Sequence, residues 1–398
     1  HYREKMDIYN KKLLFVIMYS SECGGSFIPS WKYYADMLAR RFKIETGWVF
    51  PYQQEKDWIR QLKNDYPVYF IPLPNGKKVV MELGKIISQF QPDIVHTHFE
   101  QYDISVAKAV KRFGSNIKMV WHVHDYMDFS VKGQTYPLLR YIRRRVLYAL
   151  RYHIYGKNAC FVPVSLEMAH FVNHFRHHLF TVPKEYIPEK TNVLSERITP
   201  LLNGLFLPRL GDLPQRKAKQ RSTAFRFLSF GTNFHRKGIA TLLAAGKLLS
   251  NKKYEFQIII TRGNNLEKSV RSYFAGNLPP WVKIVPQTDQ VRDLFLNADC
   301  YISPSRRETM CYAIAEAEMF LLPVIQNDSY GTLWNADMPS VFLFPSDNDI
   351  RLAEQMKQVM TADEEELSEK TLQTRERLQK LLDLDCWCER LVEIYKSL

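Results

Sequence analysis

Short apolar runs alternate with longer amphipathic runs along most of this chain, and no other feature limits its fold as strongly. Short apolar runs bounded by turns are typical of buried strands, and the longer runs have helical spacing. Strands and helices in alternation predict βαβ units with parallel sheets. The rhythm begins again near Phe225, so we expect two α/β domains within the 398 residues.

Each half has its own set of predicted elements. In the first half the strands are Leu13–Met18, Gly47–Phe50, Val68–Ile71, Ile94–His96, Lys118–His122 and Ala159–Val164, and the helices are Ile28–Arg41, Val79–Phe90 and Ile104–Phe113. In the second half the strands are Phe225–Phe230, Glu255–Ile260, Val282–Val285, Cys300–Ser303, Pro323–Ile325 and Val341–Phe344, and the helices are Ile239–Leu249 and Met310–Phe320. We place the linker just before or within the basic stretch Arg209–Phe225. The predicted domains are residues 1–204 and 205–380, followed by a final helix in residues 381–398.

Composition narrows the class of protein. The six cysteines lack CxxC or Cys/His ligand spacing, which argues against a disulfide framework or a structural zinc site and favours a reducing cytoplasm. The sequence contains no run of 18 apolar residues, so we predict no membrane-spanning helix. The net charge of +13 suits nucleic acid, anionic lipid or phosphorylated ligands and does not choose among them.

The most informative segment surrounds two carboxylates that are eight residues apart. Glu308 follows a predicted strand, and Glu316 lies about two turns deeper in the predicted helix. Carboxylates placed in this way can accept hydrogen bonds from hydroxyls, such as those of a sugar and a ribose. The alternative is that both are ordinary solvent-facing helix residues.

With these residues the sequence resembles glycosyltransferase family 4, a group of retaining enzymes with the GT-B fold. The family's mark is Pro-Ser after a strand, then Glu, seven residues, Glu, and Pro-Val entering the next strand. Pro304-Ser305, Glu308, Glu316 and Pro323-Val324 match it in register. Further matches, in order, are Gly24-Gly25, Pro92–His98, His122–Asp125, Val164-Ser165, Asn203–Leu205, Gly231, Lys237-Gly238 and Trp387. The resemblance implies two Rossmann-like domains whose parallel sheets face a central cleft.

The resemblance also implies a role for each matching residue. Lys237 would neutralise the donor diphosphate, Glu316 would hold the ribose, and Glu308 would contact the transferred sugar. His124 would lie beside the reacting face of that sugar. The catalytic set is therefore His124, Lys237 and Glu308, and the donor-binding set is Gly24, Gly25, Gly231, Arg236, Lys237, Glu308, Thr309, Met310 and Glu316.

The implied activity is the transfer of a hexose, with retention of configuration, from a nucleotide sugar to a glycan or lipid-linked acceptor. The expected donor is a UDP sugar. The transfer would serve bacterial surface polysaccharide or glycoconjugate assembly, in the cytoplasm or on the inner face of the membrane. No Asp-x-Asp constellation appears in a suitable loop, so neither a catalytic metal nor another cofactor is expected, and no motif supports nucleic-acid binding. The alternative is a GT-B-like binding or partner subunit without transfer activity.

Three positions depart from the family pattern. Thr232 stands where the phosphate-binding arginine is usual, and Arg236 is the candidate to replace it. Thr309 replaces a glycine after the first glutamate, and Leu321 replaces another glycine. The departures at Thr232 and Thr309 keep the alternative without transfer activity open.

Four histidines stand at two predicted strand ends: His96, His98, His122 and His124. Imidazoles at neighbouring strand ends can bind zinc. Because side chains alternate between the faces of a strand and no carboxylate completes a motif, we predict no metal site. His124 is expected to be a site residue and His122 a structural one.

The segment from Phe129 to Leu166 contains seven Lys or Arg and no Asp or Glu. On a helix over Pro137–Tyr155, one face would carry Arg140, Arg143, Arg144 and Arg151, and the other Leu139, Ile142, Val146 and Leu150. This pattern predicts an interfacial helix on anionic lipid. A core-facing amphipathic helix with a solvated basic side, or arginines that bind an acceptor's pyrophosphate, are the alternatives.

Overall fold

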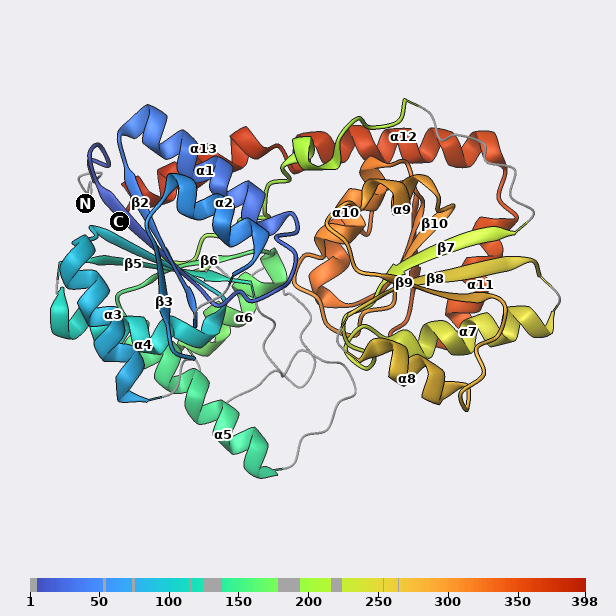
Figure 1. The fold of residues 1–398 in the computed structure, drawn as a ribbon, viewed down its shortest axis with the longest axis horizontal. Coiled ribbons are helices and arrows are strands. Elements are labelled where there is room, and N and C mark those ends of the chain that lie inside the picture. The colour runs from blue at the N-terminus through green and yellow to red at the C-terminus, as the bar shows by residue number, and fades with distance from the viewer. Residues whose placement is uncertain are drawn as a thin grey trace. The chain divides into compact units, whose positions relative to one another are not determined.

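The computed structural model describes residues 6–52, 55–73, 76–114, 116–124, 138–177, 194–215, 224–252, 254–263 and 265–398. The chain forms two compact units. The N-terminal unit comprises the described residues up to Gly204 together with Leu384–Leu398, and the C-terminal unit comprises Leu205–Asp383. Each unit is an α/β structure built on one parallel six-stranded sheet, as the sequence rhythm predicts (Figure 1).

The sheet of the N-terminal unit has the strand order β3-β2-β1-β4-β5-β6, which is that of a Rossmann fold. Neighbouring strands in this order all pair in parallel. The strands are β1 (Lys12–Ile17), β2 (Glu45–Pro51), β3 (Val68–Ile71), β4 (Ile94–His98), β5 (Lys118–Val123) and β6 (Cys160–Pro163). Each agrees with its predicted range to within two residues at either end, because short buried apolar runs define it.

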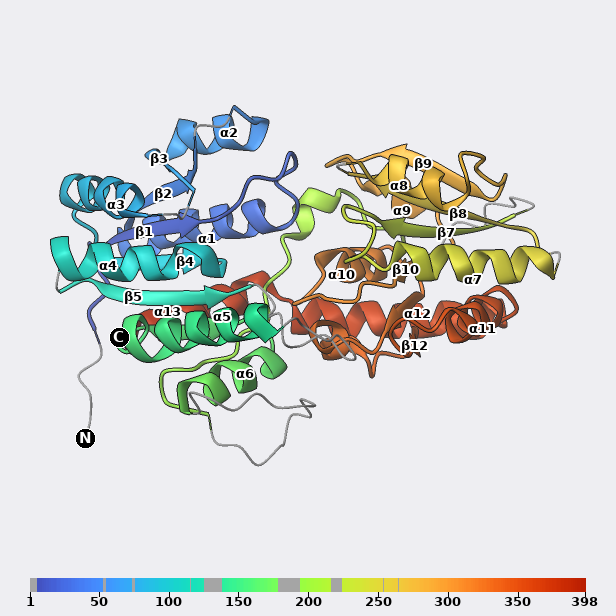
Figure 2. The same ribbon diagram turned by 90° about the horizontal axis from the view of Figure 1, so that it is seen from below.

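Helices cover both faces of this sheet (Figure 2). On one face Leu14, Val16 and Val95 pack against apolar side chains of α3 (Lys77–Phe90) and α4 (Asp103–Phe113). On the other face Phe15 contacts Trp31 of α1 (Phe27–Phe42), with ring centroids 5.5 Å apart. Two further helices of this unit are α2 (Asp57–Asp65) and α6 (Leu166–His177).

The C-terminal helix α13 (Leu384–Lys396) belongs to the N-terminal unit. Its Trp387 packs edge to face on Trp31, with ring centroids 4.8 Å apart. Gly204 lies under the same helix, because a Cβ there would lie 3.0 Å from Cβ of Trp387. The chain therefore leaves this unit after Gly204 and returns to it with α13.

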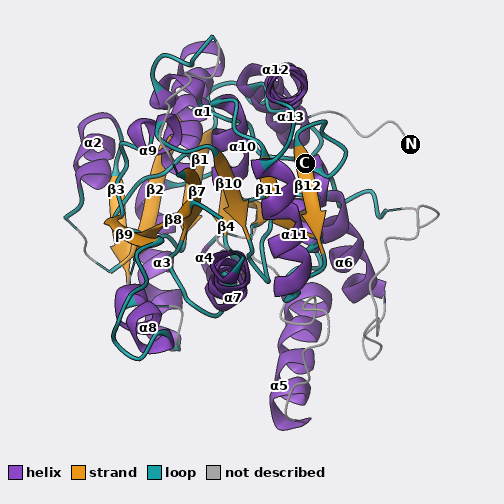
Figure 3. Ribbon diagram, turned by 90° about the vertical axis from the view of Figure 1, so that its right-hand side faces the viewer, coloured by secondary structure: helices purple, strands orange, loops and turns teal. Residues whose placement is uncertain are grey.

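The basic helix α5 (Leu138–Ala149) runs into a π-helical segment, Leu150–Tyr155. Figure 3 shows α5 extending beyond the helices that cover the sheet. None of the helices in the described part of the chain has both the length and the apolar character needed to cross a bilayer.

The sheet of the C-terminal unit has the order β12-β11-β10-β7-β8-β9 and is also parallel. Its strands are β7 (Phe225–Phe230), β8 (Phe256–Arg262), β9 (Val282–Pro286), β10 (Cys300–Ser303), β11 (Val324–Asn327) and β12 (Val341–Phe344). α7 (Ile239–Asn251) and α11 (Asp349–Met360) pack on one face, where Ile258 and Ile302 enter the same core as Leu242.

The opposite face of this sheet is covered by α9 (Arg292–Leu296), α10 (Tyr312–Met319) and α12 (Glu364–Leu381). Phe295 of α9 contacts Tyr301 of β10 and Phe320 after α10, with centroids 6.1 and 5.3 Å apart. α8 (Leu266–Tyr273) follows β8. Short 3-10 turns at Leu207–Leu210 (η4) and Tyr330–Asn335 (η5) complete the unit.

Candidate functional site

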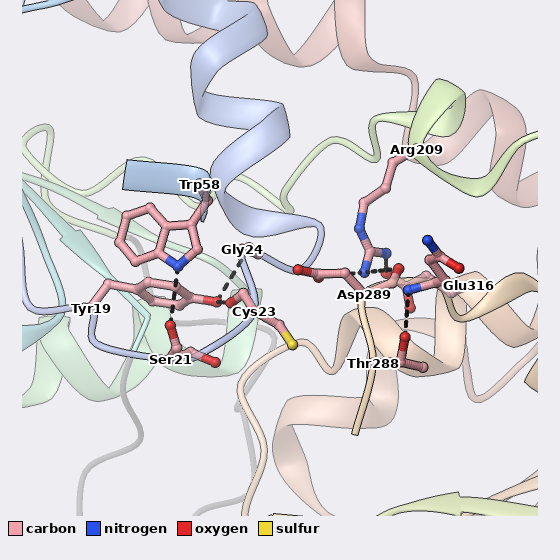
Figure 4. Close-up of polar contacts among 10 residues, drawn as sticks. Tyr19, Ser21, Cys23, Gly24, Trp58, Arg209, Thr288, Asp289 and Glu316 are labelled. Atoms are coloured by element: carbon pink, nitrogen blue, oxygen red, sulfur yellow. Dashed lines mark hydrogen bonds and ion pairs between the residues drawn. The ribbon is translucent and has the colours of Figure 1, made fainter. Parts of the chain in front are cut away.

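The loop between β1 and α1 contains the glycine pair of the predicted donor site. Tyr19 holds this loop, because its hydroxyl contacts the carbonyl oxygens of Cys23 and Gly24 at 2.8 and 3.2 Å (Figure 4). Gly24 also packs on α2, where a Cβ would lie 3.3 Å from Cβ of Trp58. Gly24 and Gly25 thus lie beyond the carboxyl end of a central strand, where open parallel sheets bind ligands.

Four buried histidines lie together on β4 and β5 and are called the histidine array: His96, His98, His122 and His124. His96 Nε2 lies 3.2 Å from His122 Nδ1. His98 Nδ1 lies 3.0 Å from His124 Nε2. The two hydrogen-bonded pairs stack, with centroids 4.5 Å apart for His96 and His98 and 4.2 Å apart for His122 and His124. The expectation that strand alternation disperses these side chains is wrong, because residues two apart on a strand share a face.

Burial keeps the histidine array uncharged. Desolvation lowers the pKa of His124 to about 3 and the pKa of each of the other three well below the ordinary value of 6.5. The array lies against α1, where the ring of Trp31 contacts His98 edge to face with centroids 4.2 Å apart. Neutral imidazoles in an apolar setting can exchange hydrogen bonds but carry no charge to a ligand.

A metal ion would use the same neutral imidazoles. Among the described residues, the donor atoms of His96, His98 and His122 lie within 4.8 Å of one another. The ring planes differ by only 10° to 21°. Imidazole lone pairs lie in the ring plane, so nearly parallel rings do not direct them to one point. This geometry favours hydrogen bonding within the array, and the expectation of no metal site stays a prediction.

The turn between β7 and α7 contains the predicted phosphate contacts. Gly231 follows β7, and α7 begins at Ile239 after Gly238, whose φ is +62°. A Cβ at Gly238 would lie 1.9 Å from the carbonyl oxygen of Pro304, so only glycine lets this turn approach the loop after β10. The first turn of α7 has no side-chain cap. Its N–H groups and the helix dipole favour an anion at this end.

Lys237 and Glu308 form an ion pair that joins this turn to the loop after β10. Both side chains are largely buried, with 16% and 9% of their surfaces exposed. Burial raises the pKa of the Glu308 carboxyl, but the charges of Lys237 and Arg236 and hydrogen bonds from Lys237 and Ser305 outweigh it and hold the pKa below 4.5. Glu308 therefore stays ionised at neutral pH.

The loop that contains Glu308 is held by three residues that the sequence analysis missed. Gly331 packs directly on it, since a Cβ there would lie 1.7 Å from the carbonyl oxygen of Glu308. Trp334 donates its indole N–H to the carbonyl of Met310 over 2.8 Å, and Asn327 donates to that of Ser305 over 2.6 Å. The sequence does show Gly331 and Trp334 close together after a predicted strand, but only the fold shows that they contact the loop with Glu308.

Glu316 lies on α10, with 5% of its side chain exposed. It forms an ion pair with Arg209, a residue that the sequence pattern did not single out. Arg209 of η4 donates from Nη1 to Glu316 Oε1 over 2.8 Å, and its Nη2 lies 3.4 Å from Asp289 Oδ1 (Figure 4). The sequence pattern places Arg209 in the basic linker. Its position just after the Asn203–Leu205 motif was the available signal. The alternative of two solvent-facing glutamates is wrong, because both carboxylates are buried and paired.

The structure also shows what surrounds the positions that depart from the family pattern at the phosphate turn and in the Glu308 loop. Arg236 Nη2 lies 3.4 Å from Thr232 Oγ1, so the guanidinium lies beside the position where the family has an arginine. The backbone N–H of Arg236 donates to Asn233 Oδ1 over 2.8 Å. Thr309 and Met310 continue the Glu308 loop, Thr309 half-buried and Met310 buried.

Arg151 does not belong to an exposed basic face, which corrects the prediction. Its guanidinium is buried and pairs with Asp103 Oδ2 at 2.5 Å and Glu100 Oε2 at 2.7 Å. Arg143 is exposed, whereas residues 129–137 and the side chains of Arg140 and Arg144 lie outside the described residues.

The apolar face of α5 is exposed as well. Leu139, Ile142 and Val146 expose 83%, 48% and 54% of their surfaces. The alternative of a core-facing helix is therefore wrong for these three residues. An exposed apolar side next to a basic side is the makeup of an interfacial helix.

Comparison with known proteins gives a match in each unit. A family model described as "Glycosyl transferases group 1" matches residues 214–377, and one described as "Glycosyltransferase Family 4" matches residues 44–183. No curated protein matches the sequence significantly.

Solved structures share the fold over nearly the whole chain. A glycosyltransferase from Rickettsia africae is 18% identical with a TM-score of 0.71, over 98% of this chain and 99% of its own. Anabaena HepE in complex with UDP and glucose is 14% identical with a TM-score of 0.73, over 98% and 100%. A mutant of S. aureus TarM in complex with Fondaparinux, alpha-GlcNAc-glycerol and UDP is 10% identical with a TM-score of 0.71, over 97% and 99%. These likenesses show the fold and confirm the predicted class of two Rossmann-like units.

Proposed function

The family matches and the fold support a GT-B glycosyltransferase of the family-4 type, and from this premise we propose a retaining hexosyltransferase. In this proposal a nucleoside diphosphate sugar is the donor and a glycan or lipid-linked glycan is the acceptor. The structures of HepE and TarM named above contain UDP, which makes UDP the first nucleotide to test. Assembly of a surface polysaccharide or glycoconjugate is the proposed pathway.

The observation that supports this proposal most is the pair of buried carboxylates on and before α10, each with its own cation. Lys237 pairs with Glu308, and Arg209 pairs with Glu316. We assign Lys237 to the donor diphosphate and Glu308 to hydroxyls of the transferred sugar. Glu316 binds the ribose hydroxyls. Two held carboxylates and a phosphate-neutralising lysine match the hydroxyls and charges of a nucleotide sugar.

The proposed reaction needs no nucleophile from the protein. The bond between the sugar's anomeric carbon and the phosphate oxygen breaks, and the acceptor oxygen bonds to that carbon on the same face. The acceptor proton passes to the departing phosphate. The protein stabilises the charge on the leaving group and orients both partners, two effects that dominate catalysis of this kind. A compact ammonium such as that of Lys237 suits the first task, and the proposed reaction uses no metal.

A GT-B-like subunit that binds but does not transfer is the second candidate. Thr232 and Thr309 favour it, since both depart from the family pattern. A thermal-shift series with UDP, GDP, CMP and dTDP tests donor binding first, because a ligand that binds only the folded state raises its melting temperature. Hydrolysis of the matching nucleotide sugar then separates the candidates. Binding without turnover supports the second candidate, and no shift with any nucleotide contradicts both.

For the acceptor side we propose that α5 rests on an anionic membrane at the cytoplasmic face. The exposed apolar residues Leu139, Ile142 and Val146 and the exposed Arg143 support this. The wild-type protein should sediment with vesicles that contain anionic lipid and less so as salt rises. Replacing Arg140, Arg143 and Arg144 by Gln should weaken sedimentation at unchanged melting temperature. A wild-type protein that ignores anionic vesicles at low salt contradicts the proposal.

A further inference from the structure

We propose that His98 is a positioning residue that fixes the tautomer of His124, so that His124 offers an Nδ1–H donor to the transferred sugar. The contact between His124 and the sugar rests on the proposed function. The tautomer is a property of the free protein, so it can be tested whether or not the protein transfers a sugar.

The contact between the two rings is short and buried. His98 Nδ1 lies 3.0 Å from His124 Nε2, and the ring planes differ by 24°. His98 is 0% exposed and His124 is 6% exposed. The ring of Phe27 packs edge to face on His124, with centroids 5.3 Å apart. The ring of Phe99 is tilted by 38° from that of His124, with centroids 5.1 Å apart. Neither phenyl ring has a polar atom, so of these three neighbours only His98 can form a hydrogen bond with the ring of His124.

Two proton arrangements satisfy this contact, because one hydrogen lies between the two nitrogens. If His98 Nδ1 carries the proton, His98 Nε2 is a bare lone pair and His124 carries its own proton on Nδ1. If His124 Nε2 carries it, His98 must carry its proton on Nε2. Burial lowers the pKa of both imidazoles, so each ring has only one N–H.

The surroundings of His98 Nε2 choose between these arrangements. This atom is buried and has no hydrogen-bond partner among the described residues. A buried N–H without an acceptor is rarer and more costly than a buried lone pair without a donor. The ring of Trp31 stands edge to face with His98, with centroids 4.2 Å apart, and its indole N–H is a donor, so its π-face is the one acceptor that Trp31 can offer, and a weak one. Nε2 of His98 is therefore the bare nitrogen, and His98 donates to His124.

The second pair of the array follows the same logic and supports the first. His122 Nε2 is also buried without a partner, so His122 donates from Nδ1 to His96 Nε2. His96 then donates from its own Nδ1 to Tyr395 Oη, 2.5 Å away on α13. Because this pair stacks on the first, it limits rotation of His98 and His124.

The fixed tautomer decides what His124 can do. With Nε2 accepting from His98, His124 has no free lone pair and cannot remove a proton from the acceptor. It can donate from Nδ1 to an oxygen of the sugar without becoming charged. This fits a reaction in which the departing phosphate takes the acceptor proton.

The direct test is a long-range ¹H–¹⁵N correlation spectrum of the full chain with ¹⁵N-labelled histidine, near pH 7. A His124→Asn variant assigns the signals of His124. We expect a protonated Nδ1 and a bare Nε2. A protonated Nε2 on His124 in the wild-type protein overturns the proposal. Signals that change upon chelation would reveal a metal on these imidazoles and overturn it as well.

Three variants then test positioning. His98→Phe keeps a stacking ring but removes the donor, and we expect His124 to move its proton to Nε2 and kcat to fall about tenfold with KM nearly unchanged. His98→Asn places an amide N–H near the former Nδ1 and should restore the tautomer and most of kcat. His122→Phe is the matched control, because it removes a hydrogen bond of the array that does not involve His124.

The outcomes separate this inference from the proposed function. If His98→Phe and His122→Phe lower kcat equally, or His98→Asn fails to restore the tautomer, His98 acts only by packing and the inference is wrong. If the wild-type protein turns over no nucleotide sugar, the proposed function fails, and the spectrum alone decides the tautomer.

Discussion

The two candidate site regions occupy similar positions at strand ends of similar sheets, yet they treat charge in opposite ways. In the N-terminal unit the histidine array is buried, neutral and internally hydrogen-bonded. In the C-terminal unit Glu308 and Glu316 are equally buried but each is paired with a cation. A buried charge is tolerated only with a partner, whereas a neutral imidazole needs only hydrogen bonds. Under the proposed function, the C-terminal region would bind the charged diphosphate of the donor, and the N-terminal region would meet only uncharged groups of the sugar.

Acid should therefore destabilise the two units differently, and this is the largest effect we expect. The folded-state pKa of each array histidine lies below 6.5, so the unfolded chain binds more protons as pH falls. Stability is fully present above pH 6.5 and is lost below it, by about 1.4 kcal/mol per pH unit for each histidine that stays neutral. Amide hydrogen exchange at pH 7.5 and 5.5, corrected for the intrinsic pH dependence of exchange, gives the opening free energies of β4 and β5 and so measures this loss.

The C-terminal unit should respond with the opposite sign over that range. Burial raises the pKa of Glu318 well above 4.5, although Asn335 donates to it over 3.1 Å. A raised carboxyl pKa means that stability grows as pH falls toward 4.5, and the lowered pKa of Glu308 costs stability only below that value. The opening free energies of β10 and α10, obtained in the same way, should not decrease between pH 7.5 and 5.5. Equal acid loss in both units would break the comparison.

The second prediction tests the charged region through Glu308→Gln. The amide keeps the shape but loses the charge that accepts from sugar hydroxyls, so transfer should fall about a hundredfold. Binding of the nucleoside diphosphate should be nearly unchanged, because that ligand lacks the sugar. Steady-state kinetics and calorimetry measure the two effects. Nucleotide affinity that falls as much as transfer does would contradict the separate roles of the two carboxylates.

The third prediction concerns Lys237→Ala. A charge-assisted contact to phosphate is worth about 1.5–3 kcal/mol, so affinity for the nucleoside diphosphate should fall at least about tenfold. Affinity for the nucleoside should change little. Because the substitution leaves Glu308 buried without its partner, the double variant Lys237→Ala/Glu308→Gln is the control for lost stability. If nucleoside and diphosphate lose affinity alike, Lys237 is structural.

The strands of both sheets could be predicted because local patterns define them. A buried parallel strand is a short apolar run whatever lies around it, and each observed strand agrees with a predicted one. Glu308 and Lys237 could be selected from their motifs, although their ion pair joins positions 71 residues apart. The GT-B class followed from the order of those motifs along the chain.

The contacts that complete the sites could not be predicted, since they depend on the register of distant segments. The array forms because β4 and β5 pair with His98 opposite His122, 24 residues later. The pair of Arg209 and Glu316 spans 107 residues. Arg151 had the helical spacing of an exposed arginine, but the fold brings Asp103 and Glu100 to it. Spacing defines the face of a helix, and tertiary packing decides what that face meets.

The smallest effect that we predict is that of Glu316→Ala, and it sharpens the division within the charged region. Loss of one or two hydrogen bonds to ribose hydroxyls is worth about 1 kcal/mol, so nucleotide affinity should fall about fivefold. Unlike Lys237→Ala, this variant should weaken the nucleoside and the diphosphate equally, because both contain the ribose. Arg209 loses a carboxylate but keeps Asp289 nearby, so Arg209→Met/Glu316→Ala controls for an unpaired guanidinium. Calorimetry with a 2′,3′-dideoxynucleotide gives the decisive comparison: wild type and variant should bind it alike. A variant that still binds it more weakly than the wild type does would show that Glu316 acts on the fold of α10 and not on the ribose.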